Sequence, residues 1–402
     1  MKTFSEYTQS KSHCIKESAD PQHTLFPVSK DDLKRMIKDE ITKQGSKADL
    51  NHIDVSNITD FSHLFEYSAF NGDVSGWNVS NVKDMSYMFS SSTFNGDLSD
   101  WNVSNVTNMR SMFSYCKSFN QDLSDWDVSK VRDMGHMFEC ARSFNQDLSG
   151  WDVSNVVDMG YVFYEASGFN GDISTWDVRN VKNMRGMFYN SDFNGNLKRW
   201  NTKNVEDMGW MFNRCKEFDQ DLSRWDVSKV TNMNSMFCDA SKFNQDISNW
   251  NVSNVTNMNR MFHGCKLFNQ DISRWNVSNV TIIKSMFEGA ESFNQDLSRW
   301  NVSKVENMEQ MFQGAESFNQ DLSEWNVSNV VNMGFMFKCA KSFNQDLSGW
   351  NVSNVFNMEY MFWECESFIQ DLSGWDVSNV TNMKGMFDGC PCPVKYQPKF
   401  SK

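Results

Sequence analysis

Residues 118–142 read SFNQDLSDWDVSKVRDMGHMFECAR, and this stretch decides the fold because close copies of it fill most of the chain. Thirteen tryptophans mark the copies at a spacing of 24 or 25 residues, from Trp77 to Trp375, and an earlier copy has Ile53 in the tryptophan position. A fixed period of this length is typical of a solenoid, in which each repeat packs only on its neighbours. Positions in a repeat are numbered here from its tryptophan, which is position 1.

The first half of each repeat has the spacing of a strand. Leu123, Trp126 and Val128 match the strand segment of a leucine-rich repeat. Side chains two residues apart on a strand share one face, so Trp126 and Val128 are expected to point into the core together.

The second half of each repeat has the spacing of a short helix. Met134, Met137 and Phe138 follow at i, i+3 and i+4, which is the apolar stripe of an amphipathic helix. The expected core is represented by Trp126, Trp225, Trp300, Met134, Met137, Phe138 and Phe144. The predicted fold is an α/β solenoid, a leucine-rich-repeat-like right-handed stack of about 14 strand–short helix coils, with an N-terminal helical cap.

The segments flanking the repeats differ from them in pattern. Ser29 is a favourable N-cap for a helix lined by Leu33 and Ile37, and Gly45 is placed to end it. The chain is therefore expected to divide into a flexible N-terminal segment (1–28), a capping helix (29–50), the repeat solenoid (51–390) and a C-terminal tail (391–402).

Composition excludes several classes of protein. The formal net charge of −13 disfavours binding to nucleic acid, whose phosphates require clustered Lys and Arg. No apolar run is long enough for a transmembrane helix, and the N-terminus has no apolar run of signal-peptide length. We expect a chain that is cytoplasmic or exported without a signal peptide, and its oligomeric state stays open.

Cysteine usage favours a reducing compartment. Five of the ten cysteines occupy position 16, where most other repeats carry Ala: Cys116, Cys215, Cys265, Cys365 and Cys390. A position shared by Cys and Ala is expected to hold a small buried side chain. A disulfide between the stacked Cys365 and Cys390 is the alternative.

The tract from Ser118 to Ser129, with the preceding Val106-Thr107-Asn108-Met109, carries a family resemblance. In these motifs the chain resembles the BspA-like leucine-rich-repeat surface-protein family of bacteria, in its 25-residue variety, over residues 51–390. The resemblance implies a non-catalytic solenoid used for adhesion or protein binding, with a host or cell-surface protein as its partner.

Position 25, just before the tryptophan, is the first candidate site because its residue varies between repeats. Four arginines fall there within five consecutive repeats, with Asn249 between them: Arg199, Arg224, Arg274 and Arg299. We call these five residues the arginine stripe. It is either solvated charge or a docking surface for an acidic partner, since Arg binds carboxylate and phosphate groups in bidentate fashion.

Aromatic residues beside the predicted helices form the second candidate site. Phe356, Tyr360 and Trp363 recur at i, i+4 and i+7, away from the core stripe. A second group joins Tyr161, Tyr164, Tyr189 and Trp210 across neighbouring repeats. Exposed aromatic patches mark contact sites, although each ring can also simply cover its neighbour.

The aspartate at position 22, as in Asp122 and Asp147, recurs in nearly every repeat. It either accepts backbone N–H groups in its own turn or contributes to a calcium-binding ladder. The six histidines are dispersed and no nucleophile elbow or phosphate-binding loop occurs, so we expect no enzyme, no catalytic residue, no metal site and no cofactor. A purely structural solenoid is the remaining alternative.

Overall fold

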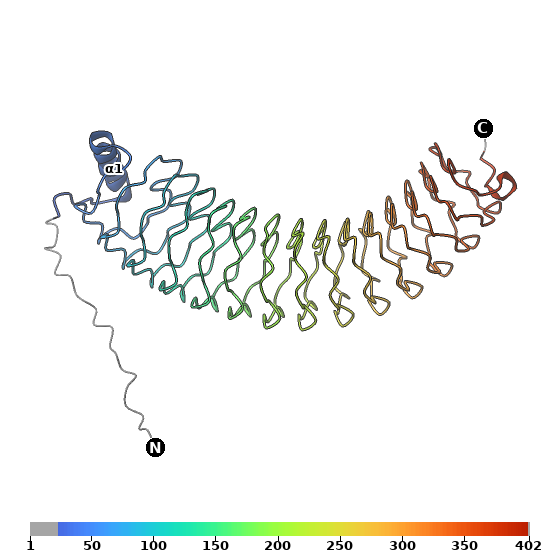
Figure 1. Ribbon diagram of the computed structural model, residues 1–402, viewed down its shortest axis with the longest axis horizontal. Helices are drawn as coiled ribbons and strands as arrows, with labels where there is room; N and C mark the ends of the chain where they lie inside the picture. Colours follow the sequence, from blue (N-terminus) through green and yellow to red (C-terminus); the bar gives the residue numbers. More distant parts are fainter. Residues whose placement is uncertain (1–22, 401–402) are drawn as a thin grey trace, which may run out of the picture.

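The computed structural model describes residues 23–400, which form a curved stack of coils with the helix α1 at its N-terminal end (Figure 1). The chain advances by one coil for each sequence repeat, so that equivalent positions lie in register along the stack. Most of the N-terminal segment predicted to be flexible, residues 1–28, lies outside the described residues.

The helix α1 spans Lys30–Gln44, between the predicted N-cap Ser29 and Gly45, and it is shorter than the predicted capping segment 29–50. The side chain of Ser29 accepts a hydrogen bond from the backbone N–H of Asp32, and Gly45 follows the last turn with φ of 86°. Leu33 and Ile37 are buried and join the hydrophobic core of the first coils. The amphipathic pattern of this segment therefore packs α1 onto the stack.

The repeats contain neither the strands nor the helices that their spacing predicts. Within residues 23–400, the repeats form isolated parallel bridges and turns but no continuous strand. Bridges run through position 8, from Asp60–Asp84 at one end of the repeats to Asn357–Asn382 at the other. The parallel alignment of coils is thus present, but it lies outside the Leu-x-x-Trp-x-Val segment.

That segment is built from two tight turns. The backbone N–H of Trp126 donates to the carbonyl of Leu123 at 3.1 Å, and the N–H of Val131 donates to Val128 at 2.9 Å. These bonds lie within one coil, whereas strand pairing requires bonds to the next one. The side chains of Trp126 and Val128 still point inward, with 3% and 1% of their surface exposed. The spacing therefore predicted correctly that these side chains are buried, but the predicted strand is wrong, because the backbone forms turns.

The predicted Met/Phe helix is also a series of turns, and its N–H groups alternate between two kinds of acceptor. In the coil of Trp126, the donors to the next coil are Met134, His136, Phe138 and Cys140, at 2.7–3.1 Å. The donors to a carbonyl three residues earlier in the same coil are Met137, Glu139 and Ala141, at 3.0–3.1 Å. Each N–H of this segment therefore finds a partner without an α-helix.

Positive φ angles explain why no helix forms. His136 and Cys140 have φ of 61° and 55°, and the same positions, 11 and 15, have positive φ in the other repeats. A positive φ at the third residue is required by a type II turn and interrupts a right-handed helix. Glycine at position 15 is the sequence signal of this geometry, and it occurs at Gly264, Gly289, Gly314 and Gly389.

The core is a set of aromatic columns that run along the stack. All seven side chains expected in it, including Trp225, Trp300 and Phe144, are at least 96% buried. Between the same two coils, the rings of Phe262 and Phe287 lie 5.8 Å apart and those of Trp250 and Trp275 lie 6.4 Å apart. The coils are closer on the side of the type II turns, so this side is the inner side of the arc in Figure 1.

The C-terminal end of the stack is covered by a short 3₁₀ helix, η1, at Val394–Tyr396. The N–H of Leu372 donates to the carbonyl of Tyr396 at 2.7 Å, and Tyr396 and Phe400 pack against the core. Residues 391–400 of the predicted tail are therefore part of the folded body.

Candidate functional site

The inner side of the arc carries the most variable residues of the repeat. Positions 9, 12, 13 and 16 are buried, and positions 10, 11, 14 and 15 lie between them on the same turns. Close packing restricts the buried positions to a few apolar or small side chains, whereas the intervening positions hold residues as different as glycine, glutamate and tryptophan. We call this surface the inner face.

Four aromatic side chains meet near the middle of the inner face. The rings of Tyr164 and Tyr189 stack at 4.4 Å, Tyr161 lies edge-on to Tyr164 at 5.7 Å, and Trp210 lies 6.2 Å from Tyr189. These residues come from three consecutive coils and were grouped correctly from the sequence. We call them the tyrosine–tryptophan cluster.

Two arginines bind the cluster from its sides. The Nε of Arg185 donates to the hydroxyl of Tyr161 at 2.8 Å, and its guanidinium lies 4.9 Å from the centre of the Trp210 ring. Arg214 lies 5.9 Å from the Tyr189 ring. Burial, followed by the neighbouring Tyr189 and Glu165, raises the pKa of Tyr164 above its usual range. The hydroxyl of Tyr164 therefore stays a neutral donor at physiological pH, and the cluster lies beside the positive charges of Arg185 and Arg214.

A second aromatic group lies on the inner face near the C-terminus. The rings of Tyr360 and Trp363 meet edge-on at 6.4 Å, and Nζ of Lys338 lies 4.7 Å from the Trp363 ring. Phe356 was predicted to join them, but its side chain is 48% exposed, and the ring that packs on Tyr360 from the preceding coil is that of Phe335, at 5.5 Å. Phe356 occupies position 7, before the turns begin, where its N–H donates to Val331 of the preceding coil at 3.0 Å.

A third group near the N-terminus was missed by sequence reasoning. Tyr87, Tyr115, His136 and Glu139 line a hollow of about 310 Å³. The carboxylate of Glu139 lies 2.8 Å from Nδ1 of His136, and its charge raises the pKa of Tyr115 to about 12. These residues occupy positions 11, 14 and 15, so comparing the variable positions between repeats would have found them.

The arginine stripe lies on the opposite side, beside the tryptophans. Its five side chains, Arg199, Arg224, Asn249, Arg274 and Arg299, are all exposed. Arg199 and Arg224 share a hollow of about 460 Å³ with Lys198 and Asp226. Lys198 pairs with Asp221 at 2.5 Å, whereas the described residues contain no ion pair to any arginine of the stripe.

The turn aspartates make the bonds expected of a structural role. Asp122 accepts the backbone N–H of Ser124 at 2.9 Å, and Asp147 accepts that of Ser149 at 2.8 Å. The N–H of Ser124 lowers the pKa of the Asp122 carboxyl. One carboxylate oxygen is thus already engaged by its own turn.

The position-16 cysteines are mostly buried in the core. Cys116 donates through Sγ to the carbonyl of Phe89 at 2.7 Å, and burial raises the pKa of its thiol to about 11. Cys365 is fully buried, Cys390 is partly exposed, and both are free thiols. These thiols therefore act as small apolar side chains.

Four overlapping segments of the chain, residues 31–149, 122–224, 206–315 and 293–396, match one family, described as Mycoplasma protein of unknown function, DUF285. No curated protein matches the sequence. Among solved structures, the chain is similar to one in the crystal structure of a TLR13–ssRNA13 complex, with 10% identity and a TM-score of 0.21, over 80% of this chain and 53% of that chain. The match thus spans about half of the TLR13 chain.

Within residues 23–400, no helix has the length and apolar character to cross a membrane.

Proposed function

The chain belongs to the DUF285 family of Mycoplasma proteins of unknown function, and we propose that it is a non-catalytic scaffold that binds a protein partner through the inner face of its solenoid. The tyrosine–tryptophan cluster with Arg185 and Arg214 carries this proposal. Trp, Tyr and Arg dominate the binding energy of protein interfaces. The BspA-like resemblance favours a host or cell-surface protein as the partner.

The contrast between constant buried positions and variable surface positions within the repeat supports this role. The buried positions keep one geometry along the stack, while positions 10, 11, 14 and 15 change from coil to coil. Solenoids use such extended curved surfaces for binding. The aromatic rings of the cluster are already held in place by each other and by Arg185, so little side-chain entropy is lost when a partner docks.

The arginine stripe supports a second surface for an acidic partner. Arg224 and Arg274 are exposed, and within the described residues neither has an opposite charge in ion-pair contact. Like charges that follow one another along a stack repel, and a partner rich in carboxylate or phosphate groups relieves that repulsion.

A capture experiment from the native host, with the partner identified by mass spectrometry, tests the binding role. Tyr189→Ala combined with Trp210→Ala is expected to weaken binding to the captured partner by at least about tenfold, because hot-spot truncations cost about 2 kcal/mol or more. Leu267→Ala is the matched control, since Leu267 is 52% exposed and lies outside the cluster. Equal binding by the double variant and the control would contradict the inner-face proposal.

Arg224→Glu combined with Arg274→Glu distinguishes the two surfaces. If the stripe is the docking surface, this variant loses affinity, and the loss is greatest at low ionic strength. If binding is unchanged across ionic strengths, the stripe is ordinary solvated surface. A protein that captures no partner from the host would favour the purely structural alternative.

The calcium-dependent alternative is tested separately. Because turn carboxylates such as Asp122 already accept backbone N–H groups, we expect the same melting temperature with excess calcium and with chelator. A rise in melting temperature with calcium would instead support a calcium-dependent repeat module.

A further inference from the structure

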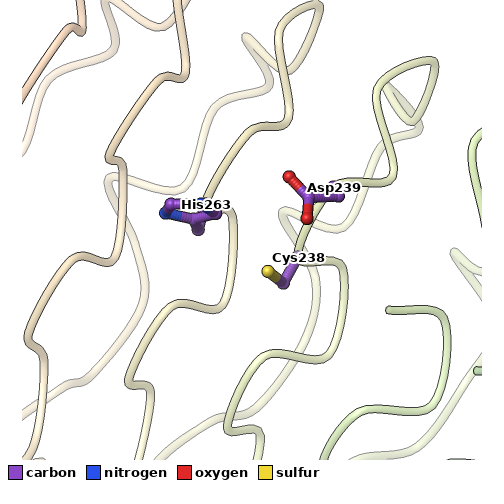
Figure 2. Close-up of side chains that lie close together, drawn as sticks. All are labelled: Cys238, Asp239 and His263. Carbon is purple, nitrogen blue, oxygen red and sulfur yellow. The ribbon is translucent and has the colours of Figure 1, made fainter. Parts of the chain in front are cut away.

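Three side chains of types that can bind a metal gather on the inner face, on the far side of Arg214 from the ring of Tyr189. Cys238 and Asp239 come from one coil and His263 from the next (Figure 2). One ligand atom from each residue lies within 4.8 Å of the other two. Among residues 23–400, no other set of three His, Cys, Asp or Glu side chains approaches in this way.

We propose that Cys238, Asp239 and His263 bind a divalent transition metal, with Zn²⁺ as the best fit, through Sγ, one carboxylate oxygen and Nε2. Thiolate, imidazole and carboxylate are the three ligand types that zinc prefers. In a tetrahedral site with normal zinc bond lengths, the ligand atoms lie about 3.3–3.8 Å apart. Small side-chain rotations therefore bring the three groups from their present separation to binding distance.

Unsatisfied atoms beside the cluster support this assignment. Nδ1 of His263 and Oε2 of Glu288, on the following coil, are both buried and have no hydrogen-bond partner, although they lie only 3.2 Å apart. A histidine that binds a metal usually donates its other N–H to a carboxylate. A metal on Nε2 of His263 would fix the proton on Nδ1 and direct it to Glu288, which satisfies both atoms.

The backbone leaves room for the carboxylate of Asp239. A Cβ at Gly264 would lie 2.4 Å from Oδ1 of Asp239, so glycine at this position permits the carboxylate to lie over the next coil. Asp239 also lines a hollow of about 540 Å³, together with Arg214 and Lys266. A water or an anionic group can reach the fourth metal position from this hollow.

Arg214 competes with a metal for Asp239. Its Nε lies 3.9 Å from Oδ2, which is at the limit of an ion pair, and the arginine side chain is 54% exposed. An exposed pair of this kind contributes little stability. On metal binding, the thiol of Cys238 loses its proton to solvent and a sulfur–metal bond forms, so no oxidant or reductant is needed.

Titration of the reduced, metal-free, full-length protein with Co²⁺ tests the site. We expect one equivalent to bind with a thiolate-to-cobalt charge-transfer band and tetrahedral d–d bands, and Zn²⁺ to displace it. Cys238→Ser and His263→Gln are each expected to abolish the charge-transfer band or weaken binding by more than about 100-fold. Glu288→Gln, which removes only the partner of His263, is expected to weaken binding about 10–100-fold.

Two cysteine variants serve as controls. Cys140→Ser changes a thiol on the same face that also lies 3.8 Å from a carboxylate, that of Glu165, but is not part of the cluster. Cys14→Ser tests the cysteine outside the described residues. Both are expected to keep the band, and circular dichroism checks that each variant is folded.

The proposal would be overturned if Cys238→Ser or His263→Gln kept the band with the affinity of the wild type, or if the band disappeared in Cys140→Ser or Cys14→Ser. Absence of cobalt binding by the wild type would also overturn it. If Cys238→Ser fails to fold, the polar ligand variants Asp239→Asn and His263→Gln decide the question. The result is independent of partner binding, because it is measured on the isolated chain.

Discussion

The indole Nε1 of Trp126 donates a hydrogen bond to the backbone carbonyl of Leu98, 3.0 Å away on the preceding coil. The ring itself is 3% exposed, so the bond satisfies the one polar atom of a side chain that is otherwise packed in the core. The same indole-to-carbonyl bond recurs along the stack, for example from Trp225 to Leu197 at 3.0 Å. The tryptophan therefore joins neighbouring coils through both its apolar surface and its N–H.

We expect Trp126→Ala to destabilise the protein by about 3–5 kcal/mol, the usual cost of truncating a large buried aromatic residue. Trp126→Phe keeps most of the apolar contact and removes the bond to Leu98, so its cost should be smaller. Denaturant and thermal unfolding measure both. Asp125→Ala, at an exposed neighbouring position, is the control, and an equal effect of all three changes would contradict the assigned role of the indole.

The left-handed backbone at position 15 predicts a second stability effect. Gly289 has φ of +68°, and the nearest atom to a Cβ built there is 3.7 Å away, so Gly289→Ala introduces conformational strain without a collision. We expect a loss of about 1–2 kcal/mol, the cost of a left-handed conformation for a residue with a Cβ. Gly349→Ala is the matched control, because Gly349 lies in open space outside the left-handed region.

Acid is expected to destabilise the stack through its turn aspartates. Backbone N–H groups lower the pKa values of Asp122, Asp172 and Asp346 in the folded state. A carboxyl with a lowered folded-state pKa stabilises the fold above its unfolded value of about 3.9 and loses that contribution as the pH falls through the folded-state value. The melting temperature should therefore decrease when the pH is lowered below about 4.

Asparagine substitutions test this explanation. Asn196 already occupies the same turn position in one repeat and accepts the N–H of Lys198 at 3.0 Å. The triple change Asp122→Asn, Asp172→Asn and Asp346→Asn should keep the turns and reduce the acid sensitivity of the melting temperature. An unchanged pH profile in the triple variant would assign acid sensitivity to other groups.

The curved stack predicts an elongated particle in solution. A compact chain of 402 residues would have a radius of gyration of about 21 Å. Small-angle X-ray scattering is expected to give a clearly larger value. A radius near that of the compact chain would be incompatible with one continuous stack.

The period and the burial pattern could be predicted from the sequence, but the local backbone could not. Met134, Met137 and Phe138 were assigned to the core because of their spacing, and they are buried. The same i, i+3, i+4 spacing fits both a helix and consecutive type II turns, since a tight turn also returns the chain to the same side after three residues. Gly264 and its equivalents at position 15 were the available signal against a helix.

The candidate sites were harder to predict because they depend on distances between coils. The tyrosine–tryptophan cluster was visible in the sequence, since Tyr164 and Tyr189 occupy position 14 of adjacent repeats and Tyr161 and Trp210 occupy position 11 nearby. Cys238 and His263 also occupy one equivalent position, 14, in adjacent repeats, but neither residue belongs to a local metal-binding motif. They lie close together because neighbouring coils stack, and a motif confined to a single repeat does not reveal this.

The unequal spacing of the coils has a consequence for copy number. Since neighbouring coils are 5.8 Å apart at the Phe262 ring and 6.4 Å apart at the Trp250 ring, every repeat turns the stack slightly toward its inner side. Deleting or duplicating one 25-residue repeat would change the width of the opening between the two ends, and yet leave each surviving pair of neighbours in the same contact. The number of repeats thus sets the width of the arc, and with it the size of the partner that the arc can enclose.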